Sequence, residues 1–150
     1  MTRLPTHADT LEVRDACLCL HAQRAARALA RRFDLAFRPV GLTNGQFSLL
    51  MSLNRPEPPR MGDVAWVLAM DRTTLTAALK PLERRGYLAV EPDATDRRAR
   101  RLRLTEAGRE VLGRALPIWR SEHKALEEEM GLPGLQLSLM KLAAAAQVEE

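Results

Sequence analysis

The chain has 150 residues, of which 46% are hydrophobic and 28% are charged, and this balance is ordinary for a soluble globular domain with a core. No apolar run approaches the roughly 20 residues that cross a bilayer, and residues 1–16 lack the apolar stretch of a signal peptide, so we expect a cytoplasmic protein with no membrane partner. The net charge of +4 lies in the middle of the chain, because residues 42–104 contain 11 Lys or Arg and 7 Asp or Glu, whereas the remainder contains 12 of each. A basic segment on a neutral frame suits a polyanion partner, with nucleic acid as the first candidate.

The first expected element is a helix over residues 13–38, where apolar residues recur every three or four positions and Pro39 and Gly41 follow. A second helix starts after Thr43, which forms a capping box with Gln46. The three prolines in RPEPPR then predict a stiff connector.

Two short helices follow this connector, and only a short turn separates them. The stretch GDVAWVLAM predicts the first, without a strong cap before Asp63. Asp71 is a good N-cap for the second, Gly86 suits its end, and Pro81 inside it predicts a kink. The apolar stripe of the second helix consists of Leu75, Leu79 and Leu82.

A basic β-hairpin is expected next, with strands over residues 87–91 and 100–104. In the second strand Leu102 and Leu104 point one way, and Arg101 and Arg103 point the other. A long helix capped by Thr105 then runs to about residue 130, with a bend at Pro117, and a last helix covers residues 135–147.

The arrangement of two adjacent short helices and a basic hairpin favours DNA binding. The second helix of a helix-turn-helix fits the major groove, which is about 12 Å wide. Small hydroxyl side chains at its start let the backbone approach the DNA, and the hairpin arginines can reach phosphates or an adjacent minor groove. Taken singly, the threonines are explained as helix caps and the arginines as a solvated face, but the joint arrangement is much less common.

Three stretches resemble the MarR family of transcriptional regulators: LTNGQFSLLMSL, DVAWVLAMDRTTLTAALKPLERRGYL and DATDRRARRLRLTEAGRE. The resemblance implies a mainly α fold (an α+β winged helix-turn-helix with long terminal helices) in a homodimer. It implies one domain over residues 1–150, with a DNA-binding part at 42–104 and dimerisation helices at 13–41 and 105–150. Asp96 and Arg98 match the Asp-x-Arg pattern of the family's wing, which implies that Arg98 enters the minor groove and Asp96 holds it in position. A pre-oriented guanidinium loses less entropy on entering a narrow, negative groove.

We therefore predict a sequence-specific DNA-binding regulator, and we expect a repressor. Two-fold symmetry implies a palindromic operator on double-stranded DNA. The residues expected to face the major groove or its phosphates are Arg72, Thr73, Thr74, Thr76 and Lys80. The residues expected to form the wing contact are Asp96, Arg97, Arg98 and Arg100.

The resemblance also implies control by a small aromatic or phenolic anion, bound between the dimer region and the winged part. In each subunit the second helix of the helix-turn-helix is the recognition helix. Such an effector acts by favouring a different spacing of the two recognition helices of the dimer. The apolar candidates for lining its cavity are Phe47, Met51, Trp66 and Trp119. We favour plain core as the explanation for these side chains.

A thiol- or metal-based signal is an alternative form of control. Residues two apart on a helix point about 200° from each other, so a disulfide between Cys17 and Cys19 needs unwinding, whereas a bond between subunits does not. Cys17 and His21 share a helix face and make half of a metal site at most. We favour the simpler explanation of a buried thiol and an ordinary polar histidine. We therefore predict no resident metal and no cofactor.

The sequence argues against two further classes of function. No nucleophile motif, Walker loop or dinucleotide fingerprint is present, so we expect no enzyme. A protein-interaction module that has lost DNA binding is the rival of a different class, but such a module has no use for Asp96 and Arg98.

Overall fold

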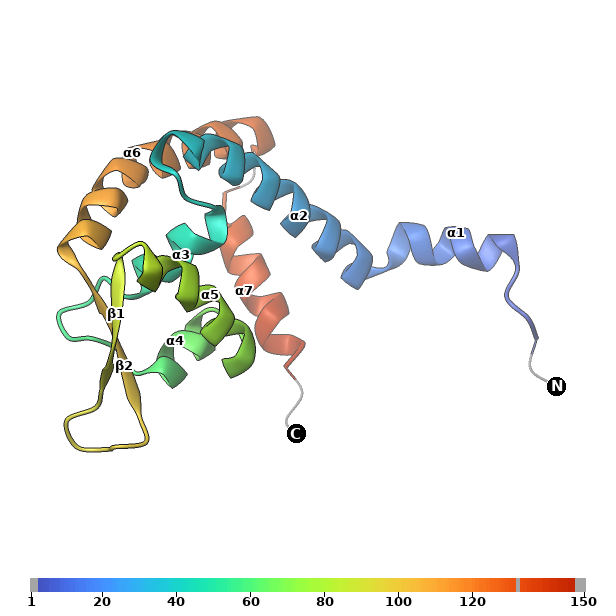
Figure 1. The fold of residues 1–150 in the computed structure, drawn as a ribbon. Helices are drawn as coiled ribbons and strands as arrows, with labels where there is room; N and C mark the ends of the chain where they lie inside the picture. Colours follow the sequence, from blue (N-terminus) through green and yellow to red (C-terminus); the bar gives the residue numbers. More distant parts are fainter. Residues whose placement is uncertain (1–2, 132, 148–150) are drawn as a thin grey trace.

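Helices make up most of the chain, and the structure, a computed structural model, describes residues 3–131 and 133–147 (Figure 1). The helices are α1 (His7–Ala16), α2 (Leu18–Phe37), the 3-10 turn η1 (Arg38–Val40), α3 (Asn44–Ser52), α4 (Met61–Val67), α5 (Arg72–Arg84), α6 (Glu106–Met130) and α7 (Leu135–Ala145). Two antiparallel strands, β1 (Leu88–Pro92) and β2 (Arg100–Leu104), form a hairpin between α5 and α6. The fold is therefore mainly helical with a two-stranded wing, as predicted.

The buried core joins the middle of the chain to the inner halves of α2 and α6. Its solvent-inaccessible side chains come from α2, α3, α4, α5, β2 and α6, and include Phe37, Leu50, Val64, Leu75, Leu82, Leu102 and Val111. The predicted stripe of α5 is confirmed, because all three of its leucines are buried. In Figure 1, α2 and α6 lie together along one side, with α3, α4 and α5 beneath them.

Helix starts follow the capping residues in the sequence. The Thr43 hydroxyl accepts a hydrogen bond from the Gln46 amide while the Gln46 side chain accepts one from the Thr43 amide, which completes the predicted capping box. Asp71 and Thr105 cap α5 and α6 in the same way, by accepting the amide N–H of the residue three positions later. Both α5 and α6 continue through their internal prolines.

The prediction of one unbroken N-terminal helix over residues 13–38 is wrong. The chain forms two helices that meet at Cys17, whose φ of −71° and ψ of 110° lie outside the helical region. The first begins earlier than expected because Thr6 and Asp9 form another capping box. Cys17 serves as the N-cap of the second, with its Sγ 3.5 Å from the Leu20 amide nitrogen. Local capping at Thr6 and Cys17 therefore decides where the two helices begin.

The expected stiff connector takes part in the wing sheet. β1 pairs with β2 in a register that sets Leu88 opposite Leu104 and Val90 opposite Leu102. On the other side of β2, the Leu102 amide donates to the Pro59 carbonyl at 3.0 Å, and Arg60 pairs with Arg101 as an isolated bridge. Residues 59–60 thus act as a third, very short strand that ties the wing to the start of α4.

The terminal helices are much less covered than the core. Neither α1 nor α7 contains a buried residue. Figure 1 shows α1 and the first part of α2 extending away from the rest of the chain, while α7 turns back from the end of α6. Among the described helices, none has both the length and the apolar character needed to cross a membrane.

Candidate nucleic-acid interface

A four-residue turn connects α4 to α5. The Met70 amide donates to the Ala65 carbonyl at 2.9 Å, which closes the end of α4. Ala69 in this turn has a φ of 50°, in the left-handed region that L side chains adopt at a cost. The turn brings Asp71 directly to the start of α5, so the two helices pack as a helix-turn-helix.

The face of α5 opposite its leucine stripe is exposed. It carries the predicted residues Arg72, Thr73, Thr74, Thr76 and Lys80, and also Ala77. Two of the three threonine hydroxyls are already engaged: Thr74 donates to the Asp71 carboxylate and Thr76 to the Arg72 carbonyl, each at 2.7 Å. Each of these hydroxyl groups has used its one proton in the hydrogen bond that it donates. Its oxygen keeps its lone pairs and can still accept a hydrogen bond from the solvent side.

Asp71 remains charged beside this surface. The Thr74 backbone amide and then the Thr74 hydroxyl donate to its carboxylate, and these hydrogen bonds hold the pKa of Asp71 below its ordinary value. Its negative charge lies at the N-terminus of α5, where the helix dipole stabilises it.

The tip of the wing is built by hydrogen bonds to the backbone. The Asp96 carboxylate accepts the Arg98 amide N–H at 2.9 Å, and the Asp96 carbonyl accepts the Ala99 amide N–H at 3.1 Å. Arg100 donates to the carbonyls of Arg97 and Ala99. The side chains of Arg97 and Arg98 are exposed, and among the described residues neither forms an ion pair.

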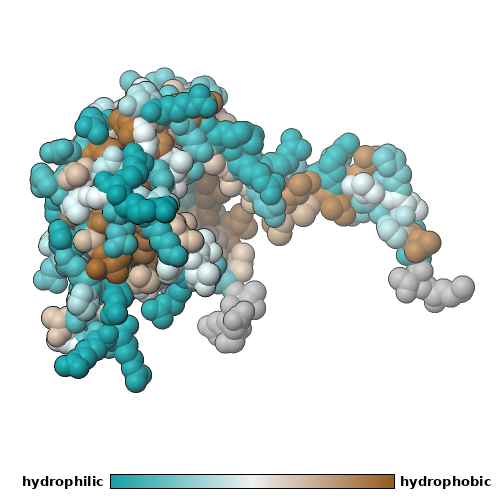
Figure 2. Space-filling view, in the orientation of Figure 1, coloured by the Kyte–Doolittle hydropathy of each residue, from teal (hydrophilic) through white to brown (hydrophobic). Residues whose placement is uncertain are grey.

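The arginine run divides into two groups with different surroundings. Arg97, Arg98 and Arg100 lie at the exposed tip, which protrudes as a hydrophilic projection in Figure 2. Arg103 pairs with Glu91 across the hairpin at 2.6 Å. Arg101 donates to the Pro58 carbonyl at 2.7 Å and belongs to the base of the wing.

Asp93 is the charged residue that the sequence analysis missed. Its side chain is only 1% exposed and forms ion pairs with the Nε atoms of Arg60, at 2.9 Å, and Arg101, at 3.4 Å. The Thr95 amide, which donates at 3.1 Å, is the largest cause that lowers the pKa of Asp93, followed by the charges of Arg101 and Arg60. Asp93 therefore joins the connector, β2 and the wing turn. The position of Asp93 in the turn between two expected strands was the only signal in the sequence that could have drawn attention to it. Nothing in the neighbouring sequence indicates that Arg60 and Arg101 are its partners.

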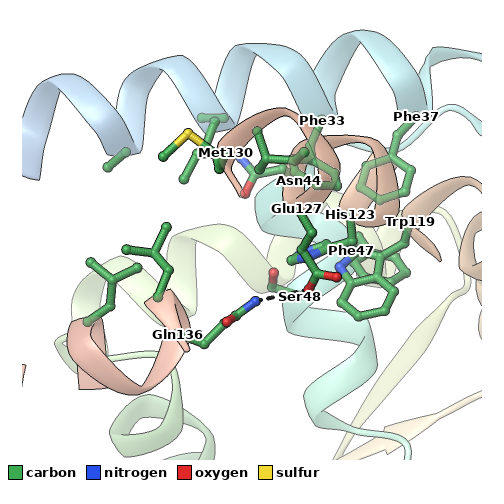
Figure 3. A pocket seen from close by; sticks show the side chains of 16 residues that line it. Phe33, Phe37, Asn44, Phe47, Ser48, Trp119, His123, Glu127, Met130 and Gln136 are labelled. Carbon is green, nitrogen blue, oxygen red and sulfur yellow. Dashed lines mark hydrogen bonds between the residues drawn. The ribbon is translucent and has the colours of Figure 1, made fainter. Parts of the chain in front are cut away.

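A cavity of about 370 Å³ lies between α2, α3, α6 and α7 (Figure 3). Two of the four apolar residues expected to line an effector cavity, Phe47 and Trp119, line this one. The structure does not bring the other two there: Met51 packs against the core, and Trp66 is 79% exposed on α4. The aromatic wall is completed by Phe33, Phe37 and His123, which the sequence analysis did not assign to it.

The two cysteines are free thiols near the helix break, Cys17 half-buried and Cys19 exposed. The ring of His21, which was considered with Cys17 as half of a metal site, lies with its Nε2 3.1 Å from the Asp15 carbonyl oxygen. Within residues 3–131 and 133–147, no group of three or more His, Cys, Asp or Glu side chains gathers as a metal site.

Comparisons with known proteins agree with this geometry. Residues 42–99 match the model of the MarR family. The transcriptional regulator MosR of Mycobacterium tuberculosis, solved in complex with DNA, is 37% identical, with 87% of this chain and 96% of that chain covered and a TM-score of 0.80.

Two other relatives carry different descriptions. The transcriptional repressor CouR, solved on a 23-mer DNA duplex, is 28% identical with 97% of this chain and 100% of that chain covered and a TM-score of 0.76; CouR has also been solved with p-coumaroyl-CoA. The transcriptional activatory protein BadR of Rhodopseudomonas palustris is 36% identical over 91 residues, or 59% of this chain. The match spans 52% of BadR, so the chain aligns with about half the length of this curated relative.

Proposed function

The chain belongs to the MarR family of winged helix-turn-helix transcriptional regulators, and from this premise we propose that it is a homodimeric repressor that binds a palindromic operator. Its DNA-binding part is residues 42–104, and residues 13–41 and 105–150 form the dimer. The family consists of transcription regulators, not enzymes. Because its proposed target is DNA, we expect the protein to act inside the cell.

The observation that carries this proposal is the division of the arginine run. Arg101 and Arg103 are held by partners within the wing, whereas Arg97 and Arg98 are exposed at its tip without an ion pair among the described residues. Unpaired guanidinium groups on a protruding turn are suited to phosphates or a narrow minor groove. Beside the wing, α5 supplies the surface for the major groove, with Arg72, Thr73, Thr74, Thr76 and Lys80 on its exposed side.

The terminal helices supply the surface for dimerisation. Val13 and Leu18 are 59% and 67% exposed, and Leu137 and Met140 in α7 are 55% and 68% exposed. Figure 2 shows hydrophobic side chains along the extension formed by α1 and the first part of α2. Apolar surface of this extent is characteristic of protein interfaces, and a second copy that covers it would also set the distance between two recognition helices.

The cavity between α2, α3, α6 and α7 is the proposed site of a small aromatic effector. It adjoins both the terminal helices and α3, so a ligand there contacts the two parts whose relative position sets the spacing of the recognition helices. A ligand with different affinities for two arrangements shifts their populations and weakens operator binding by the same factor. The related repressor CouR binds p-coumaroyl-CoA, which supports an aromatic effector.

A thiol signal is the second candidate, because Cys17 lies in the break between α1 and α2. The helical geometry that separates residues two apart by about 200° does not apply across a residue with extended backbone. Oxidation of Cys17 and Cys19 there would alter the junction at which the proposed dimerisation segment bends. Thiol titration before and after peroxide treatment, beside operator binding, tests this candidate.

Fluorescence anisotropy with labelled DNA from upstream of the protein's own gene tests the main proposal, over several salt concentrations. We expect tight, specific binding with a steep salt dependence, and Arg98→Ala should weaken it and reduce the salt slope by about one. Arg114→Ala, an exposed arginine on α6, is the matched control and should leave the slope unchanged. Weak binding that is equal for all three proteins, together with a random-sequence selection that enriches no site, would refute DNA recognition.

A further inference from the structure

One buried carboxylate joins the wing to the helix-turn-helix. Asp93 directly follows β1, and its Oδ2 lies 2.9 Å from Nε of Arg60 and 3.4 Å from Nε of Arg101. Arg60 is the N-cap residue of α4, and Arg101 belongs to β2. We propose that Asp93 is a positioning residue for DNA recognition, which fixes the wing tip relative to α5 and so sets the minor-groove position that Arg98 reaches. The inference rests on the proposed DNA-binding function.

The outer half of the hairpin has little apolar packing to hold it. The buried leucines of the two strands, Leu88, Leu102 and Leu104, lie between the middle of the hairpin and its base. From residue 91 to residue 100, all of which the structure describes, Asp93 is the only buried residue. A two-stranded hairpin is only marginally stable on its own. The direction of the wing tip therefore depends on the contacts that Asp93 makes.

The connector before α4 holds the wing at three points. Two of them involve β2 alone: its Leu102 amide donates to the Pro59 carbonyl at 3.0 Å, and its Arg101 side chain donates to the carbonyl of the preceding proline at 2.7 Å. The third is the ion pair between Arg60 and Asp93, at the end of β1. Contacts to a single strand leave the hairpin free to rotate about that strand, and a contact at the other strand removes this freedom. Asp93 is therefore the point at which both strands are tied to the start of α4.

The same carboxylate also shapes the turn that carries Arg98. Its Oδ1 accepts the Thr95 amide N–H at 3.1 Å, and the Asp93 amide donates to the Ala99 carbonyl at 3.2 Å, so the turn is closed on Asp93. Its Oδ2 faces the two arginines. One oxygen thus holds the turn while the other is anchored to α4 and β2, and the orientation of Arg98 follows that of the helix-turn-helix.

A fixed wing matters because the two grooves are read at a set distance from each other. Successive base pairs lie about 3.4 Å apart along DNA and are rotated by about 35°. A narrow minor groove with an enhanced negative potential depends on the sequence and is typical of A-tracts. With α5 in the major groove, a rigid wing selects operators in which such a stretch lies at one offset. A loose wing accepts neighbouring offsets and must be ordered on binding, which costs affinity.

Asp93→Asn tests the proposal, because asparagine keeps an oxygen for the Thr95 amide and loses the charge that pairs with the two arginines. Removal of a negative charge by itself favours binding to DNA, so the charge change and the loss of positioning act in opposite directions. At a temperature at which circular dichroism shows the variant folded, we expect it to bind the operator about fivefold more weakly than the parent, with an unchanged salt slope. Glu91→Gln is the matched control, since it removes a charge from the same hairpin, where Glu91 pairs with Arg103. It should bind as tightly as the parent or slightly more tightly.

A double-mutant cycle with Arg98→Ala separates positioning from a general loss of stability. We expect Arg98→Ala to weaken operator binding about tenfold in the parent and about twofold in the Asp93→Asn background, because a loose wing gains little from its arginine. Arg60→Gln should give the same coupling and provides a test if Asp93→Asn fails to fold. An operator with one base pair inserted between the α5 site and the wing site, both located by footprinting, should lose less affinity for Asp93→Asn than for the parent.

The outcomes for Asp93 and for DNA binding are distinguishable. Additive effects of Asp93→Asn and Arg98→Ala, or equal operator affinities of Asp93→Asn and Glu91→Gln, would overturn the proposal. Where the parent binds one operator specifically and Arg98→Ala weakens that binding, such a result leaves DNA recognition intact and removes only the role of Asp93. A parent that binds no DNA specifically overturns both.

Discussion

The Asp96 carboxylate accepts a hydrogen bond from the backbone N–H of Arg98, with 2.9 Å between Oδ1 and the nitrogen. The aspartate of the Asp-x-Arg pattern thus acts on the backbone that carries the arginine. The guanidinium remains exposed and unpaired among the described residues. A turn held in this way presents the arginine without occupying the donors that would contact DNA.

This geometry predicts different effects of two substitutions at Asp96. Asp96→Asn keeps an oxygen that accepts the Arg98 amide, whereas Asp96→Ala does not, and both remove one negative charge. We expect Asp96→Ala to bind operator DNA about fivefold more weakly than Asp96→Asn, which corresponds to about 1 kcal/mol for one hydrogen bond. Anisotropy at one salt concentration measures the difference. Equal affinities of the two variants would show that the turn hydrogen bond does not position Arg98.

Asp93 predicts a change in the response of stability to acid. The pKa of its carboxyl is held below the ordinary 3.8 by the Thr95 amide and by Arg101 and Arg60, so its stabilising effect is present above that value and is lost as the pH falls through the lowered pKa. We expect Asp93→Asn to be less stable than the parent at neutral pH and to lose less additional stability below about pH 4. Urea unfolding across this pH range measures both effects. Glu110→Gln, an exposed residue on α6, is the control, and parallel curves for parent and Asp93→Asn would contradict the prediction.

Ala69 predicts a stabilising substitution in the turn before α5. Its φ of 50° is unfavourable for a residue with a Cβ and favourable for glycine. We expect Ala69→Gly to raise the free energy of unfolding by roughly 1 kcal/mol, offset in part by the greater freedom of glycine in the unfolded chain. Ala77→Gly, on the exposed face of α5, should instead lower it by about 1 kcal/mol. Urea unfolding that shows equal losses for both variants would rule out strain at Ala69.

Gly108 predicts a close contact at the base of the wing. A Cβ at this position would lie 2.2 Å from the Tyr87 carbonyl oxygen, which also accepts the Thr105 amide and therefore cannot move freely. Gly108→Ala should lower the free energy of unfolding by about 1–3 kcal/mol through overpacking.

Gly113 on the same helix is the matched control, since nothing lies within 4 Å of a Cβ built there. Gly113→Ala should raise the free energy of unfolding by up to about 1 kcal/mol, from helix propensity alone. Thermal unfolding followed by circular dichroism measures the pair. A stabilised Gly108→Ala would show that α6 can shift away from Tyr87 at little cost.

Most of the secondary structure was predictable because its signals are local. Thr43, Asp71 and Thr105 each cap a helix through the amide three positions later, and all three starts were placed correctly. The one wrong helix, over residues 13–38, failed for the same local reason. The apolar stripe of this segment begins at Leu18, and the capping of two separate helices divides the chain just before it, at Cys17.

The candidate site was predictable only in part, because partners far apart in the sequence decide the role of each charge. The sequence by itself determined that residues 42–104 carry the excess positive charge. It also determined that a helix-turn-helix, formed by α4 and α5, is followed directly by a basic hairpin. Only the tertiary structure decided that Arg60 and Arg101 both pair with Asp93, while Arg97 and Arg98 stay exposed. It also decided that Trp119 lines the cavity and Trp66 does not. Periodicity and capping act within a few residues, whereas an ion pair or a cavity exists only where the fold brings distant elements together.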